Sequence, residues 1–338
     1  MNFSDRNVLI VGGAGYVGSV LASLLLNAGA KVTLLDQLLY DNGFAIQHLL
    51  DHERLRFVRG DLRDEATFAQ AAKGATDVVL LASLVGDPIC KKYPELAVSV
   101  NQDGAIRMIE SLDKLGVKRF VFTSTCSNYG IHDPATLADE GSELNPQSLY
   151  ARTKIDVEQH LLKSTKQAEF CGTVLRIATA YGLSPRMRFD LTVSQFGWEL
   201  ASGAPLLVYD ADTWRPYCHI RDISKAIMTV LTAPSERVRG EVFNVGDTSQ
   251  QFTKRMIVEE IQKHLPGTQV EYRAGDTDPR NYRVSFEKIA QRLGFKCDHS
   301  VQTYLPRVVE AVQAGIFPDV RNNSRFGNYQ ISGVAAKA

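Results

Sequence analysis

The stretch VLIVGGAGYVGSVLASLLL, residues 8–26, joins an apolar run to a helical pattern through three regularly spaced glycines. Gly12 permits a tight turn, Gly15 lets the backbone approach a phosphate, and Gly18 allows the helix to pack closely on the strand. The N-terminus of that helix presents amide groups and a positive dipole end to an anion. The stretch therefore predicts a dinucleotide-binding turn, and a purely structural turn is the alternative.

A carboxylate at the end of the next predicted strand supports the dinucleotide interpretation. Asp36 stands where a carboxylate accepts hydrogen bonds from the ribose of adenosine. Residues 37–39, QLL, include no arginine for a 2′-phosphate, which favours NAD over NADP. Asp61 and Leu62 follow the third predicted strand and are placed at the adenine, with a helix cap as the alternative role of Asp61.

Composition excludes several classes of partner. The 338 residues contain 38 Lys and Arg against 38 Asp and Glu, so no net positive field recruits nucleic acid or an anionic membrane. The start, MNFSDRNVLIV, has no basic segment or cleavage site, and no apolar stretch reaches membrane-spanning length. We therefore expect a cytoplasmic protein. The cysteines form no CxxC pair, which argues against disulfides and a zinc site; they are Cys90, Cys126, Cys171, Cys218 and Cys297.

Short apolar runs alternate with helical patterns in the first half of the chain. The predicted strands are 7–11, 31–35, 55–58, 78–81, 119–123 and 173–177, and the predicted helices are 17–27, 65–72, 94–115 and 149–163. Strands that alternate with helices need crossover connections, so they form a parallel sheet with helices on both faces. The fold class is therefore α/β, a doubly wound sheet of the Rossmann type.

The pattern loosens beyond residue 180, which suggests a second part. We expect residues 1–180, with returning segments near 214–247, to bind NAD. Residues 181–338 are expected to form mainly a smaller α/β part that binds substrate over the carboxyl edge of the sheet. Its predicted helices are 223–231, 254–264, 286–293 and 304–314, and the tail from Arg321 is expected to be loosely ordered.

Two side chains one helical turn apart form a candidate acid–base pair. In SLYARTK, Tyr150 and Lys154 project from one face of a helix. An ammonium near a phenol stabilises the phenolate and lowers the tyrosine pKa from about 10 towards neutrality. Tyr150 is therefore predicted to act as a general base. The stretch FTSTCSNYG places Thr125 at the end of the fifth predicted strand.

The GxxGxxG spacing, the YxxxK pair and Thr125 together resemble the extended short-chain dehydrogenase/reductase family, in its NAD-dependent nucleotide-sugar epimerase/dehydratase group. The stretches LRIATAYG, RPYCHIRD, FNVGD and DPRNYRVS carry the resemblance over almost the whole chain. It implies a nucleoside diphosphate sugar as substrate. It also implies that Tyr150 takes a sugar hydroxyl proton while hydride leaves the same carbon for the nicotinamide, with Thr125 bonded to that oxygen. A homodimer joined through the helix at Tyr150 and the segment 106–115 is a further implication.

The resemblance assigns binding residues. Those implied to hold NAD are Gly12, Gly15, Tyr16, Val17, Gly18, Asp36, Asp61, Leu62, Leu81, Ala82, Ser83, Asn101, Tyr150 and Lys154. Those implied to hold substrate are Val85, Gly86, Cys126, Ser127, Thr179, Arg188, Arg215 and Arg280. Arg215 and Arg280 match positions that grip the diphosphate. Surface ion pairs explain Arg186, Arg188 and Arg283 equally well, and capping or packing at the start of a helix explains Asn101.

Departures from the family pattern limit the reactions that we expect this chain to catalyse. Cys126 and Ser127 stand where sugar-nucleotide dehydratases carry acidic residues, which disfavours dehydration. Leu80 or Leu81 replaces a usual histidine, Thr179 replaces an asparagine, and His219 with Asp222 looks like a structural link between the domains. The resemblance then implies a 4-epimerase working through a 4-keto intermediate. The alternatives are a 4-dehydrogenase of a GDP-heptose-like substrate and a non-catalytic NAD(H)-binding regulator.

Overall fold

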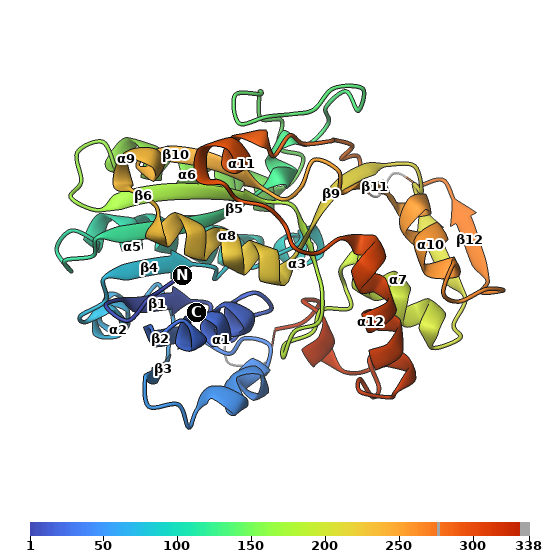
Figure 1. Cartoon of the computed structure of the whole chain (residues 1–338), viewed down its shortest axis with the longest axis horizontal. Coiled ribbons are helices and arrows are strands. Elements are labelled where there is room, and N and C mark those ends of the chain that lie inside the picture. Colours follow the sequence, from blue (N-terminus) through green and yellow to red (C-terminus); the bar gives the residue numbers. More distant parts are fainter. Residues whose placement is uncertain (276–277, 332–338) are drawn as a thin grey trace.

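A seven-stranded parallel sheet forms the centre of the molecule, in the order β10-β6-β5-β4-β1-β2-β3. The computed structural model describes residues 1–275 and 278–331 (Figure 1). The strands of this sheet are β1 (Asn7–Val11), β2 (Lys31–Asp36), β3 (Leu55–Arg59), β4 (Asp77–Leu80), β5 (Arg119–Thr125), β6 (Cys171–Ile177) and β10 (Glu241–Val245). Strand order reverses between β1 and β4, which confirms the doubly wound Rossmann-type sheet and places the switch point beside the glycine turn.

Helices cover both faces of this sheet. Successive side chains of a strand point to opposite faces, so Ile10 and Leu9 of β1 belong to two different clusters of buried residues. One face packs against α1 (Gly18–Asn27) and α8 (Ile220–Thr232). The other packs against α2 (Glu65–Ala72), α5 (Ala105–Ser111) and α6 (Leu149–Ser164).

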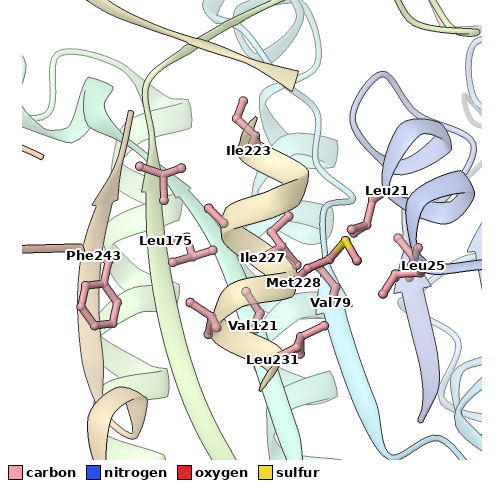
Figure 2. Packing of buried hydrophobic residues seen from close by; sticks show 14 of the residues in the cluster. Leu21, Leu25, Val79, Val121, Leu175, Ile223, Ile227, Met228, Leu231 and Phe243 are labelled. Atoms are coloured by element: carbon pink, nitrogen blue, oxygen red, sulfur yellow. The ribbon is translucent and has the colours of Figure 1, made fainter. Parts of the chain in front are cut away.

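Helix α8 comes from the second half of the chain but packs on strands and a helix formed by the first half. Figure 2 shows Ile227 and Leu231 against Val79 and Val121 of β4 and β5, with Met228 beside Leu25 of α1. Strand β10 adds an edge strand to the sheet, and α8 covers one of its faces. Both elements come from residues that follow 181 in the sequence. Residues that follow 181 in the sequence are therefore built into the large sheet and its core.

The remaining elements build a smaller lobe at the carboxyl edge of the sheet. It contains two small sheets, β11-β9-β7 and β12-β8. Their strands are β7 (Thr179–Tyr181), β8 (Leu206–Tyr209), β9 (Trp214–His219), β11 (Gln251–Thr253) and β12 (Val270–Arg273). Helices α7 (Thr192–Ala201), α10 (Lys254–Gln262) and α12 (Val301–Gln313) pack on them, while α9 (Ser235–Val238) and α11 (Glu287–Leu293) lie beside β6 and β10.

One predicted helix is divided in the structure. The segment 94–115 contains α4 (Pro94–Val98), a π-helical stretch η2 (Ser99–Gly104) and α5, and α3 (Asp87–Lys92) precedes it. Proline lacks the N–H that continues a helix, so Pro94 starts a new one. Short 3₁₀ turns occur at η1 (Asn42–Leu49), η3 (Cys126–Tyr129) and η4 (Ser324–Phe326).

The tail is more ordered than predicted. Residues 324–331 return from the small lobe to the large sheet, where Ile331 is 9% exposed and joins the cluster around α2, α5 and α6. The expectation of a loosely ordered tail from Arg321 is therefore wrong for this stretch, because apolar packing holds it; residues 332–338 lie outside the described part. Among the described residues, no helix is both long and apolar enough to cross a membrane.

Candidate active site

A cavity of about 640 Å³ lies at the carboxyl edge of the large sheet, between the sheet and the small lobe. Residues of both parts line it, among them Gly12, Asp36, Tyr150, Arg215 and Arg280. Open α/β sheets bind ligands at this edge, outside the switch point of the strand order. The sequence motifs that are far apart along the chain therefore meet in one place.

The glycine turn fits a dinucleotide diphosphate. Gly12 has φ +89, and a Cβ there would lie 2.6 Å from the backbone N of Ala82, so only glycine is accommodated without a shift. A Cβ on Gly18 would lie 2.3 Å from the carbonyl oxygen of Gly12. Helix α1 has no side-chain cap and no acidic residue in its first turn. Its N-terminus is thus open to a negatively charged ligand.

Asp36 ends β2 at the cavity wall. Its carboxylate accepts the N–H of Ala14 at 3.0 Å and the N–H of Leu38 at 2.8 Å. Burial raises the pKa of Asp36, and these two backbone hydrogen bonds, with the side chain of Asn42, oppose that rise. Each carboxylate oxygen accepts more than one hydrogen bond, so the group can also receive ribose hydroxyls.

Asp61 and Leu62 also line the cavity. The Asp61 carboxylate pairs with Arg63 at 2.6 Å. Asp64, whose side chain accepts the N–H of Thr67, caps α2 instead. The alternative role of Asp61 as the helix cap is therefore wrong.

Thr125, Tyr150 and Lys154 all line the same cavity. Ser148 caps α6 by accepting the N–H of Ala151, which starts the helix just before Tyr150. One turn later, the Lys154 ammonium donates to the carbonyl oxygen of Thr123 at 2.9 Å. It lies 5.8 Å from the centre of the Tyr150 ring. The structure brings together the three residues that the sequence indicated as a catalytic set.

The electrostatics of this pair differ from the prediction. The surrounding protein desolvates Tyr150 and raises its pKa; Cys90 and Asp87 add to the rise, and Arg188 and Arg280 oppose it. Burial lowers the pKa of Lys154 to about 8. In the ligand-free protein the pKa of Tyr150 is therefore raised and not lowered towards neutrality, so this prediction is wrong, because the phenol is desolvated and the Lys154 ammonium is directed at a carbonyl.

A group of basic side chains lies at the small-lobe end of the cavity. Arg280 forms a two-pronged ion pair with Asp278 at 2.7 and 2.8 Å and a second with Asp87 at 3.2 Å. Arg215 also contacts Asp278, at 3.0 Å. Lys254 lines the same end and donates to the carbonyl of Tyr209 at 2.7 Å. Lys254 was missed because a lysine at the start of a helix carries no sequence signal of its own.

Most other predicted residues also line the cavity: Gly15, Tyr16, Val17, Leu81, Ala82, Ser83, Val85, Gly86, Ser127, Thr179 and Arg188. Arg186 and Arg188 are 2% and 7% exposed, so the alternative of surface ion pairs is wrong for both. Arg283 is not brought into this set; its guanidinium lies 5.0 Å from the centre of the Trp214 ring.

Two predicted ligand contacts are placed elsewhere. Asn101 lies inside η2 rather than at the start of a helix, and its amide makes two hydrogen bonds, at 2.7 and 3.0 Å, to the backbone of Leu84. Cys126 is 1% exposed, and its thiol donates to the carbonyl of Arg176 at 3.3 Å. Burial raises the pKa of Cys126, so its thiol stays neutral.

His219 and Asp222 join the two parts of the chain. The Asp222 carboxylate accepts the backbone N–H groups of Asp298 and His299 and contacts the His299 ring at 3.1 Å. The rings of His219 and His299 stack at 4.1 Å. These contacts fix the segment before α12 to the start of α8, which confirms the expected structural link.

The fold, the open helix N-terminus and the Thr-Tyr-Lys set define a dinucleotide-dependent enzyme. The sequence model of the "NAD dependent epimerase/dehydratase family" matches residues 8–246. The chain belongs to this family, and its cofactor is NAD.

Individual relatives span nearly the whole chain. It is 28% identical over 312 residues to a UDP-glucose 4-epimerase of Corynebacterium glutamicum, which covers 87% of this chain and 91% of that one. It is also 28% identical to the low-salt glycan biosynthesis protein Agl12 of Haloferax volcanii, over 90% and 97% of the two chains. The solved structure of MoeE5 in complex with UDP-glucose and NAD has a TM-score of 0.80 and 25% identity, covering 92% of this chain and all of that one.

Proposed function

We propose that this enzyme is a nucleotide-sugar 4-epimerase, which oxidises the C4 hydroxyl of its substrate to a ketone and reduces it again from the other face. The observation that carries the proposal is the convergence of Thr125, Tyr150 and Lys154 with the basic group at the small-lobe end of one cavity. Similarity to a UDP-glucose 4-epimerase over most of the chain supports it.

Each residue of the catalytic set has a distinct role in this proposal. When bound, NAD supplies the hydride acceptor and a positively charged ring. In the complex, the phenolate of Tyr150, which the positive charges of NAD and Lys154 would stabilise, takes the proton of the C4 hydroxyl as the C4–H bond breaks, so the carbon loses one hydride and the oxygen one proton. Thr125 hydrogen-bonds the same oxygen. Lys154 would contact the nicotinamide ribose and would contribute positive charge near the phenol.

The small lobe is proposed to hold the nucleoside diphosphate. Arg215 and Arg280 would exchange part of their contact with Asp278 for the two phosphates, and Lys254 adds a third cation. Val85, Gly86, Ser127 and Thr179 are proposed to surround the sugar. Residues 181–338 are on this view mainly substrate-binding.

Two features disfavour dehydration. Elimination of water needs an acid and a base beyond Tyr150, and the positions after Thr125 hold Cys126 and Ser127. Cys126 faces the core and its thiol remains protonated. Ser127 contacts Tyr282 and Arg280, each at 3.3 Å, and offers no carboxylate.

The test is incubation of the purified enzyme with UDP-, dTDP- and GDP-sugars. We expect interconversion of two C4 epimers, resolved by NMR, with no net reduced nicotinamide at 340 nm. Reduced cofactor equal to the ketone formed would replace this proposal by the 4-dehydrogenase. No conversion of any of these sugars by a fold-intact enzyme that still binds NADH would contradict it and favour a non-catalytic regulator.

A homodimer formed through α5 and α6 is a further part of the proposal. Ile106 on α5 and Leu162 on α6 remain partly exposed although they pack on the core of their own chain. A second copy would cover these apolar side chains. Light scattering at micromolar concentration tests this, and a monomeric mass would contradict it.

A further inference from the structure

The segment that follows β7 folds back over the glycine turn. The Tyr16 hydroxyl donates to the carbonyl of Gly182 at 2.6 Å. Ser184 donates to the carbonyl of Tyr16 at 2.8 Å and lies 3.3 Å from the hydroxyl of Ser19. Residues 182–190 are thereby held against the N-terminal end of α1, where the dinucleotide diphosphate is expected.

Two buried guanidinium groups lie in this segment and line the cavity. Arg188 forms a two-pronged ion pair with Asp190, at 3.0 and 2.6 Å. In the part of the chain that the structure describes, the Arg186 guanidinium donates only to neutral oxygens, the carbonyl of Gly327 at 3.1 Å and the side chain of Asn328 at 2.7 Å. Among residues 1–275 and 278–331, no carboxylate lies within ion-pair distance of Arg186. A buried cation without a direct counter-ion is costly, and a bound anion relieves that cost.

A neighbouring hydroxyl also lacks a partner. The Tyr40 ring lies 5.0 Å from the Arg186 guanidinium. Its hydroxyl is buried and has no hydrogen-bond partner in the described part of the chain. Tyr40 lines the cavity just beyond Asp36 in the sequence. A buried donor left unpaired destabilises the ligand-free protein, and a phosphate oxygen would satisfy it.

The C-terminal strap, residues 324–331, holds this group in place. Phe326 accepts the N–H of Phe189 at 2.7 Å, and Asn328 donates its backbone N–H to Asp190 at 3.3 Å. The Asn328 side chain also reaches the carbonyl of Val85 at 3.5 Å, so the strap bridges the small lobe and the large sheet. In Figure 1, the red end of the chain runs from α12 towards α1.

We propose that Arg186, Arg188 and Tyr40, held by the C-terminal strap, bind the diphosphate of NAD together with the N-terminus of α1, so that the enzyme retains its cofactor between turnovers. The inference rests on NAD as the cofactor and not on the proposed reaction. A substrate diphosphate has the same chemistry, and the sequence placed Arg188 with the substrate. The packing of residues 182–190 on the glycine turn favours the cofactor.

The test measures NADH dissociation, by fluorescence during displacement with excess NAD, in Arg186→Gln, Asn328→Ala and Tyr40→Phe. We expect each change to speed dissociation, by about tenfold for Arg186→Gln, because a charge-assisted hydrogen bond is lost. Less NAD should also be released when the purified variants are denatured. Arg283→Gln is the matched control and should behave as the wild type. UDP and GDP, used as probes of the substrate site, should bind all variants with unchanged affinity.

Unchanged NADH dissociation in Asn328→Ala and Tyr40→Phe would overturn the proposal. Weaker binding of UDP or GDP with unchanged NADH dissociation would overturn it too, and would assign the arginines to the substrate. Tyr40→Phe removes only an unpaired buried hydroxyl and should not lower the melting temperature of the ligand-free protein, so the test survives if Arg186→Gln fails to fold. None of these readouts uses epimerase activity, so failure of the proposed function is a separate result.

Discussion

The Lys154 ammonium donates to the carbonyl of Thr123 at 2.9 Å, so that this side chain links α6 to the end of β5. It also lies 4.8 Å from the centre of the Phe122 ring. Lys154 is only 2% exposed, and its charge is held by a dipole and an aromatic face rather than by a direct ion pair. The protein therefore keeps a desolvated cation at the site of the proposed reaction.

This desolvation predicts a pH dependence of stability. The pKa of Lys154 falls from 10.5 to about 8 on folding, so between these values the unfolded chain binds more protons and stability rises with pH. Burying the charge costs about 3 kcal/mol below pH 8 by this shift. Lys154→Met should stabilise the ligand-free protein near pH 7, by an amount that shrinks towards pH 10. Urea unfolding of both proteins across this range measures it, and a gain independent of pH would contradict the assignment.

Tyr150→Phe should strongly reduce turnover while leaving the cofactor bound. Loss of a general base costs about 10²–10⁴-fold in rate. The phenyl ring keeps the packing, so the NADH dissociation constant should change little. Steady-state kinetics on an active nucleotide sugar and NADH titration check both parts. Tyr93→Phe, at the junction of α3 and α4, is the matched control and should retain full activity. Full turnover in Tyr150→Phe would remove it as the base.

A buried ion pair connects α6, the helix that carries Tyr150 and Lys154, to strand β6. Glu158, one turn after Lys154, forms a two-pronged pair with Arg176 of β6 and also accepts hydrogen bonds from Ser124 and Asn128. Both charged side chains are at most 6% exposed. Glu158→Gln leaves the guanidinium without its counter-ion and should lower the free energy of unfolding by about 3–5 kcal/mol.

The control for this prediction is an exposed pair. Asp212→Asn breaks the ion pair of Asp212 with Arg255 and should cost less than about 1 kcal/mol, because solvent screens exposed charges. Equal losses of stability in the two variants would show that the Glu158–Arg176 pair is not a desolvated one.

Local patterns predicted those parts of the fold and the site that depend on neighbouring residues. The strands end within a few residues of their predicted ends because apolar β-branched runs are interrupted by helical patterns. Asp36, Thr125 and Tyr150 meet because parallel strands and the helices after them deliver their ends to one edge of the sheet.

Such local patterns could not predict contacts between segments that are far apart in the sequence. Arg186 and Asn328 are separated by 142 positions, and nothing near either one indicates the other. Cys126 is the first residue of the turn η3 and follows the end of β5. The alternation of side chains along a strand therefore no longer predicts which way its side chain points. The upward shift of the Tyr150 pKa depends on desolvation by all the residues around the phenol. The four-residue spacing of Tyr150 and Lys154 contains no information about that desolvation.

The last prediction separates the two diphosphate sites proposed for this cavity. Arg280 contacts Asp278, Asp87 and Ser127 at the small-lobe end, and it reaches none of the residues of the C-terminal strap among its described ion pairs and hydrogen bonds. Arg280→Met should raise KM for the nucleotide sugar about tenfold or more, since a hydrogen bond to a charged group contributes about 1.5–3 kcal/mol. NADH dissociation should stay at the wild-type rate. Arg283→Met, three positions along the same segment and stacked on Trp214, should change neither quantity, and a loss of NADH binding in Arg280→Met would mean that the two sites are not distinct.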